Sequence, residues 1–76
     1  DEPQQAGITL YPNPATNKVH IEGAEVDEVQ VYNVFGQLLK LCRGQEISVE
    51  DMSKGAYLLR VRTKDGRLET ARLMVR

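Results

Sequence analysis

The chain has 76 residues, of which 41% are apolar and 28% are charged, a composition typical of globular proteins. A chain this short buries one small core and leaves no room for a second domain. It contains no apolar run near the roughly 20 residues of a membrane-spanning helix, and no basic segment followed by an apolar stretch. We therefore expect neither a membrane span nor a retained signal peptide within these residues. The single cysteine excludes an intramolecular disulfide, and the single histidine leaves no obvious metal cluster.

The net charge of −1 is unevenly distributed along the chain. Residues 1–38 contain six acidic residues and one basic residue, whereas residues 39–76 contain nine basic and five acidic residues. The positive charge is densest in residues 60–76, with six basic residues and two acidic ones. Such asymmetry indicates either an interaction surface near the C-terminus or an ordinary solvated strand face that the acidic half balances.

From Ile8 onward the apolar residues recur with a period of two, which predicts strands rather than helices. Alternation is strict over residues 18–22 and 28–32, and it recurs over 47–50, 56–62 and 68–76. Residues 1–7 show no apolar periodicity and are predicted to be a linker. The side chains predicted to face the core are Val19, Ile21, Val29, Val31, Ile47, Val49, Tyr57, Leu59, Val61, Ala71, Leu73 and Val75.

Turn residues separate these runs at short intervals. Pro12 and Pro14 lack the N–H that a strand ladder needs, and Gly36 and Gly55 each mark a break between runs. The dipeptide Asp65-Gly66 joins two alternating runs, which predicts a tight hairpin with a type I′ turn. About seven short strands without a helix predict an all-β sandwich or small barrel.

The sequence offers no convincing catalytic site. His20 alternates with apolar residues on a predicted strand, so it points outward, and no serine is marked as a nucleophile for it to activate. Cys42 lies beside Arg43, which can lower a thiol pKa, but a small inert cysteine is the simpler interpretation. The six glycines are scattered and form no phosphate-binding loop. We expect no enzymatic activity, no cofactor, no metal and no small-molecule substrate.

The overall charge argues against nucleic-acid binding. Arg60, Arg62, Arg67 and Arg72 could line one face, with tyrosines available for stacking. The pI of about 5.8 is far from the basic balance of such domains. The residues alone thus predict a small all-β binding or recognition module, with its basic C-terminal hairpin as the best candidate surface.

The order of the motifs resembles a known family. They are, in chain order, Leu10-Tyr11-Pro12-Asn13-Pro14-Ala15, the strand at 18–22, residues 29–38 (VQVYNVFGQL), residues 47–49, residues 54–61 (KGAYLLRV), Asp65-Gly66, and the basic and apolar strand that ends at Arg76. Together they resemble the type A C-terminal sorting domain of cargo proteins exported by the type IX (Por) secretion system of Bacteroidetes. The resemblance covers residues 8–76.

The resemblance implies a seven-stranded Ig-like antiparallel sandwich that acts as a secretion signal. Such a domain takes a cargo protein from the periplasm through the outer-membrane translocon to the cell surface or the medium. A sortase-like peptidase then typically removes the domain and anchors the cargo to the surface. Processing is expected within residues 1–7, at or near Gln5, Ala6 and Gly7. The implied partners are the translocon, the sortase components and the attached cargo.

The resemblance also assigns candidate site residues. Translocon or sortase recognition is expected at Lys64, Arg67, Arg72, Leu73, Val75 and Arg76. The motif residues with an expected structural role are Pro12, Asn13, Pro14, Gly36, Gly55, Tyr57, Asp65 and Gly66. For Arg72 and Arg76, direct recognition and a contribution to solubility both remain open.

A second function class is an accessory sandwich that binds polysaccharide or another surface ligand for a larger secreted enzyme. Carbohydrate modules usually display exposed aromatic platforms, whereas this chain has no tryptophan and 5% aromatic residues. We expect a monomer or a weak, strand-swapped dimer, because a small sandwich leaves open edge strands.

Overall fold

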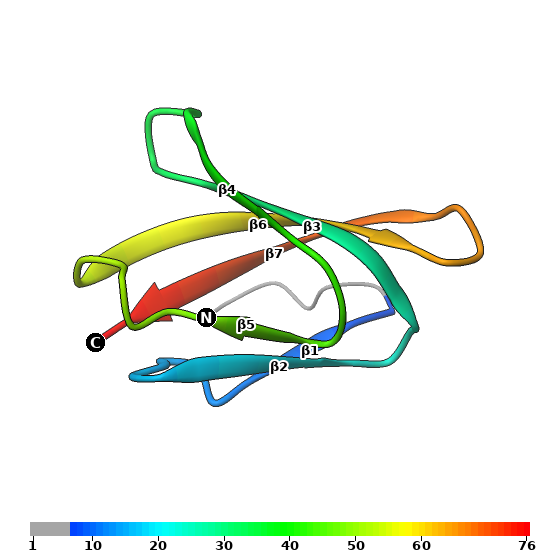
Figure 1. Ribbon diagram of the computed structural model, residues 1–76, viewed down its shortest axis with the longest axis horizontal. Coiled ribbons are helices and arrows are strands. Elements are labelled where there is room, and N and C mark those ends of the chain that lie inside the picture. The colour runs from blue at the N-terminus through cyan, green and yellow to red at the C-terminus, as the bar shows by residue number, and fades with distance from the viewer. Residues whose placement is uncertain (1–6) are drawn as a thin grey trace.

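A computed structural model describes residues 7–76, which form seven β-strands and no helix (Figure 1). No helix in this part of the chain is therefore long and apolar enough to cross a membrane. The strands are β1 (Thr9–Tyr11), β2 (Lys18–Glu22), β3 (Val26–Tyr32), β4 (Leu38–Cys42), β5 (Glu46–Ser48), β6 (Gly55–Thr63) and β7 (Leu68–Val75).

The strands form two layers (Figure 1). One sheet has the order β1-β2-β5 and the other has the order β4-β3-β6-β7, and every pairing between named strands is antiparallel. This confirms the predicted all-β sandwich. The more specific Ig-like topology stays a prediction.

The core lies between the two sheets and comes from the inward positions of the alternating strands. Val19, Ile21, Val29 and Val31 are fully buried, as the alternation predicts. The other buried apolar residues are Ile8, Ala15, Val26, Ile47, Val49, Leu59, Val61, Ala71, Leu73 and Val75. Tyr57 is half-buried and packs against this core. A core built mostly from valine, isoleucine and leucine suits two pleated faces packed on each other.

The β6–β7 hairpin forms as predicted, but its turn is not type I′. Asp65 has no positive φ, while Gly66 has a φ of +91°. The Gly66 N–H donates to the Thr63 carbonyl over 3.0 Å, and the Thr63 N–H donates to the Arg67 carbonyl over 2.9 Å. Residues 64–66 therefore form a three-residue loop, a type I turn followed by a left-handed glycine. Gly66 is needed there because L side chains rarely adopt that conformation.

The β3–β4 hairpin uses the same loop geometry. The Gly36 N–H donates to the Asn33 carbonyl and the Asn33 N–H donates to the Gln37 carbonyl, each over 3.0 Å. Gly36 has a φ of +83°. The two hairpins of the four-stranded sheet thus end in equivalent loops, at residues 34–36 and 64–66.

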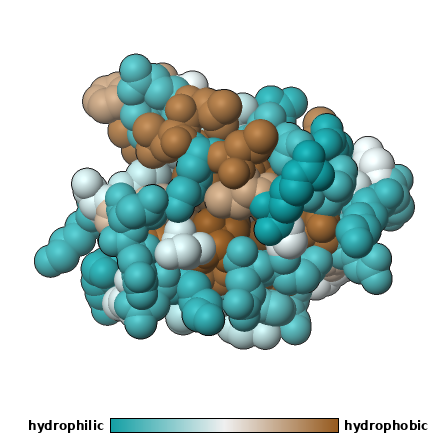
Figure 2. All heavy atoms as spheres, in the orientation of Figure 1, coloured by the Kyte–Doolittle hydropathy of each residue, from teal (hydrophilic) through white to brown (hydrophobic). Residues whose placement is uncertain are grey.

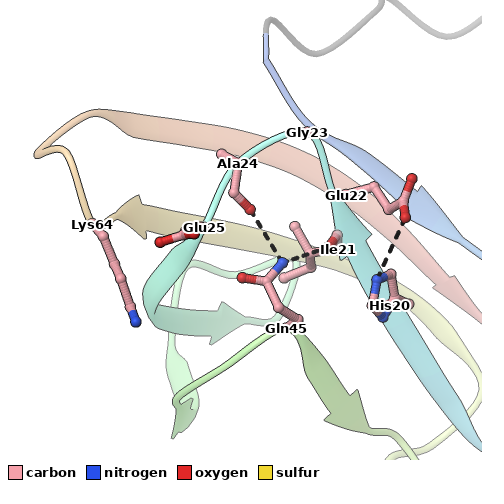
Figure 3. A pocket seen from close by; sticks show the side chains of 8 residues that line it. All are labelled: His20, Ile21, Glu22, Gly23, Ala24, Glu25, Gln45 and Lys64. Carbon is pink, nitrogen blue, oxygen red and sulfur yellow. Dashed lines mark hydrogen bonds and ion pairs between the residues drawn. The ribbon is translucent and has the colours of Figure 1, made fainter.

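The Gln45 side chain bonds to the backbone where the chain crosses from one sheet to the other (Figure 3). Its side-chain N–H groups donate to the carbonyls of Ile21, over 2.6 Å, and Ala24, over 3.1 Å. Its side-chain oxygen accepts from the Val26 N–H over 2.6 Å. The amide thus satisfies three backbone groups where the chain leaves β2 and enters β3. A shallow hollow of about 520 Å³ lies beside it.

Strand pairing brings the acidic and basic halves of the chain together. The Arg62 guanidinium lies 3.2 Å from an Asp27 carboxylate oxygen and 3.0 Å from one of Glu28. Arg43 also reaches Asp27, over 3.6 Å. Part of the charge separation seen along the sequence is therefore neutralised in space, where Arg62 on β6 and Arg43 after β4 meet the acidic residues of β3. Four basic residues form no ion pair with a described residue: Lys54, Arg60, Lys64 and Arg76.

Candidate functional site

The candidate site is β7 with the segments that hold it. β7 is an edge strand of the four-stranded sheet and pairs with β6 along its whole length. Alternation gives the strand two different faces. Ala71, Leu73 and Val75 are buried in the core, whereas Arg72 and Met74 are exposed on the outside of the sheet. A partner that meets the folded domain therefore encounters the outward residues.

The side chain of Asn13 binds the free edge of β7. Its side-chain N–H donates to the Arg72 carbonyl and its side-chain oxygen accepts from the Met74 N–H, each over 3.0 Å. The amide thus takes the place that a neighbouring strand would fill. Pro12 and Pro14 flank Asn13, and both X-Pro bonds around it are cis.

Ala15 continues the same contact toward the C-terminus. Its N–H donates to the Met74 carbonyl and its carbonyl accepts from the Arg76 N–H, each over 2.8 Å. Ala15 also forms a parallel bridge with Val75 and is fully buried. We call residues 12–15 the proline clamp. It occupies the edge of β7 from Arg72 to Arg76, so no further strand can add there unless the clamp moves.

The clamp gives Asn13 a measurable structural role. Replacing Asn13 with alanine removes two hydrogen bonds and is expected to lower the free energy of unfolding by about 1–2 kcal/mol. Amide exchange at Met74 should become faster, because its N–H loses its acceptor. Asn17→Ala is the matched control, since the Asn17 side chain bonds to no described residue. Unchanged exchange at Met74 in the Asn13 variant would mean that the Asn13 side chain does not hold the edge of β7.

The loop at the other end of β7 is held by its own polar network. The Thr63 hydroxyl donates to the Asp65 carboxylate and accepts from the Arg67 N–H, over 2.9 Å. The Arg67 guanidinium lies 3.2 Å from Asp65 and 3.3 Å from Glu69. The hydrogen bond from Thr63, followed by that from Arg67, holds the pKa of the Asp65 carboxyl below its usual value. Asp65 therefore stays ionised at neutral pH and fixes Arg67.

The structure separates the six predicted recognition residues into three places. Lys64 and Arg67 lie at the β6–β7 loop, at the start of β7, whereas Arg72 and Arg76 lie toward its C-terminal end (Figure 1). Leu73 is 0% exposed and Val75 is 6% exposed. These two face the core and are out of reach of a partner while the domain is folded.

The motif residues lie at the loops and strand ends. Gly55 begins β6, and the Tyr57 hydroxyl donates to the Ser53 carbonyl over 2.5 Å, which ties the preceding loop to the strand. Among the predicted processing residues, Gln5 and Ala6 lie outside the described residues. Gly7 is exposed at the start of the described chain, close to the side chains of Arg67 and Glu69.

The other candidate groups lie away from β7. His20 lies on the outside of β2, with its ring nitrogens 3.8 Å from a Glu22 oxygen and 3.7 Å from a Glu46 oxygen. The Tyr11 ring lies 5.2 Å from the His20 ring, and partial desolvation together with Glu22 raises the pKa of its hydroxyl. Cys42 is half-buried against the core. No three metal-ligating side chains converge within residues 7–76.

Sequence reasoning missed the roles of Asn13 as a clamp and of Gln45 as a crossover bridge. The position of Asn13 between two prolines was a partial signal, because it marked a segment that cannot continue a strand ladder. Gln45 carried no comparable signal, since a glutamine in a polar loop is unremarkable until its three backbone partners are known.

The described residues form a small sandwich in which Asn13 and Ala15 hold the edge of β7 and Arg72 faces outward. A comparison with known families matches residues 9–76 to the secretion system C-terminal sorting domain. The chain belongs to this family of type IX secretion sorting domains, as its motifs predicted. Members of the family are sorting signals and not, in general, catalysts.

One curated relative is the beta-agarase D of Zobellia galactanivorans. The chain is 30% identical to it over 70 residues, which cover 90% of this chain and 15% of the agarase. The chain thus spans a small part of that relative's length. No solved structure matches the chain.

Proposed function

We propose that this chain directs an attached cargo protein across the outer membrane through the type IX translocon. The supporting observation is the display of β7: the proline clamp and the core hold the strand, so that Arg72 faces outward and Arg76 follows its end. A signal read by other proteins needs a fixed surface with defined chemistry and no reactivity of its own. The exposed end of β7 meets that need.

We further propose that the chain is the C-terminal part of a larger secreted protein. The match to a short part of a much longer agarase supports this arrangement. The cargo would cross the periplasm, pass the outer membrane and reach the cell surface or the medium. A sortase-like peptidase would then cut within residues 1–7, near Gln5, Ala6 and Gly7, and anchor the cargo.

Within β7 the proposed roles differ by exposure. Arg72 and Arg76 are the proposed contacts with the translocon or sortase, and Lys64 and Arg67 form a second proposed contact at the loop. Leu73 and Val75 act indirectly, by holding the strand in the sheet, because burial keeps them from a partner.

Reversing the charge of the two terminal arginines should block export. For a reporter that carries a signal peptide and residues 1–76 in a type IX-competent Bacteroidetes host, Arg72→Glu/Arg76→Glu is expected to lower the exported fraction at least about tenfold. Where the parent arginines meet acidic groups of a partner, the two glutamates place like charges in contact, which weakens binding by several kcal/mol. The exported and periplasmic reporter fractions give the measurement.

Lys18→Glu/Lys54→Glu is the matched control, with the same change in net charge at two exposed residues outside β7. Both double variants should unfold at a urea midpoint near that of the parent chain, since all four residues are exposed. Export of the Arg72/Arg76 variant at the level of the control would show that these arginines are not part of the signal.

A further inference from the structure

The hairpin that joins β3 and β4 displays an unusual number of apolar side chains. Val34 is 70% exposed and Phe35 is 83% exposed, at the tip of the loop. Leu38, Leu39 and Leu41 on β4 are each about half exposed. We call residues 33–41 the apolar hairpin. Figure 2 shows hydrophobic residues gathered in this region, at the upper left, where Figure 1 shows the hairpin projecting from the sandwich. Apolar patches of this kind mark interaction sites in soluble domains.

The fold does not require apolar residues at the tip. The loop at 64–66 has the same three-residue geometry and the same hydrogen-bond pattern, yet it carries Lys64 and Asp65 where the apolar hairpin carries Val34 and Phe35. One turn geometry thus accommodates both chemistries within a single chain. Val34 and Phe35 are therefore not required to form the turn.

The backbone of the tip is already satisfied within the loop. The Asn33 side-chain oxygen accepts from the N–H groups of Phe35, over 2.9 Å, and Gln37, over 3.0 Å. The N–H groups of Asn33 and Gly36 donate to carbonyls of the same loop. The Asn33 side-chain N–H donates to the Gln37 side chain over 2.8 Å. Since these groups are paired internally, moving the tip out of water leaves few donors without a partner.

The charges around the apolar hairpin suit an anionic surface. No acidic residue occurs between Glu28 and Glu46, whereas Lys40 and Arg43 lie in that interval. Lys40 pairs with Asp51 over 2.9 Å, and Arg43, whose side chain is 72% exposed, lies 3.6 Å from Asp27. Arg60 faces the same side of the sheet, because Gln30 pairs with Leu41 on one side and with Arg60 on the other.

We propose that the apolar hairpin lies along the interface of a membrane with anionic headgroups, with Val34, Phe35 and the exposed leucines of β4 toward the acyl layer. A projecting, convex tip with apolar side chains needs no matching cavity in a fluid acyl layer, whereas a protein partner needs a groove of its shape. Arg43 and Arg60 then lie near the headgroups, where each basic side chain adds attraction. This places the domain on a membrane surface independently of how the translocon reads β7.

The test uses the 76-residue chain and vesicles of two compositions. One set contains equal parts of phosphatidylglycerol and phosphatidylethanolamine, and the other contains phosphatidylcholine alone. The parent chain should co-float with the anionic vesicles and less with the neutral ones, and about 0.5 M salt should weaken the binding. Val34→Lys/Phe35→Asp copies the chemistry of the 64–66 loop and should lower the partition coefficient at least about tenfold. Phe35→Ser provides a milder variant, and unfolding in urea checks that both stay folded.

Leu68→Ser is the matched control, since Leu68 is 57% exposed on the same sheet but lies outside the apolar hairpin. It should bind vesicles like the parent chain. The proposal is wrong if the parent chain stays in solution with anionic vesicles, or if the tip variants bind as well as the parent. It is also wrong if sedimentation shows self-association that the tip variants abolish while no vesicle binding occurs, because the apolar hairpin would then be a contact between copies. The assay contains no translocon, so its failure leaves the sorting function untouched.

Discussion

Replacing Leu73 with alanine is expected to lower the free energy of unfolding by about 3–4 kcal/mol. Leu73 is fully buried at the centre of the inward face of β7, opposite Tyr57 on β6. The substitution removes apolar contacts and leaves a cavity that two packed sheets cannot easily close. In a small domain this is a large share of the total stability. Equilibrium unfolding in urea, followed by circular dichroism, measures the change.

Leu68→Ala is the natural control for that experiment. Leu68 starts the same strand but is 57% exposed, so its loss should cost less than about 1 kcal/mol. Equal losses in the two variants would contradict the described burial of β7. The Leu73 variant should also be exported poorly, because the strand that presents Arg72 is no longer held. Removal of residues 72–76 acts in the same indirect way, which makes charge reversal the cleaner test of recognition.

Replacing Gln45 with alanine is expected to lower the free energy of unfolding by about 2–4 kcal/mol. The variant leaves the Val26 N–H and the carbonyls of Ile21 and Ala24 without their side-chain partner. Each partly buried group left unpaired costs about 1–3 kcal/mol, less where water can reach it. Thermal unfolding and amide exchange at Val26 measure the effect.

Gln37→Ala is the matched control for the Gln45 variant. The Gln37 side chain accepts one hydrogen bond from Asn33 at an exposed loop, so its removal should cost less than about 1 kcal/mol. If the two glutamine variants unfold together, Gln45 does not brace the crossover between the sheets.

Period-two alternation predicted most of the fold, because a strand that buries one face carries apolar residues at every second position. Val29 and Val31 on β3, or Leu59 and Val61 on β6, point inward wherever the strand is placed. The same alternation also argues against the two-residue turn that was predicted at Asp65-Gly66. The inward residues of β6 and β7 all have odd numbers, so they can pair across the hairpin only if its loop has an odd number of residues. Asp65-Gly66 as a two-residue turn would have placed Leu59 opposite an outward residue.

Contacts between residues far apart in the sequence could not be predicted from local patterns. Asn13 meets Arg72 and Met74 about 60 positions further along, and no periodicity links an exposed asparagine to a strand at the other end of the chain. The burial of Leu73 and Val75, by contrast, is what the alternation along residues 68–76 predicts. The role of β7 in recognition stays a prediction, and the alternation along the strand decides which of its side chains face outward, where a partner could touch them.

β7 contributes side chains both to the core and to the outer surface of the domain. Its inward side chains complete the core, and its outward side chains Arg72 and Met74 are exposed. The proline clamp couples the two, because it holds the edge of the strand from Arg72 to Arg76. This arrangement supports the proposal that β7 carries the sorting signal in a fixed orientation.

The most direct test of the sorting function is a gain of export. A folded reporter with a signal peptide and residues 1–76 at its C-terminus is produced in a Bacteroidetes host with an intact type IX system and in a host that lacks the translocon. We expect the reporter at the cell surface or in the medium of the first host and in the periplasm of the second. Retention of the folded reporter in the periplasm of both hosts, or equal export from both, would contradict the account.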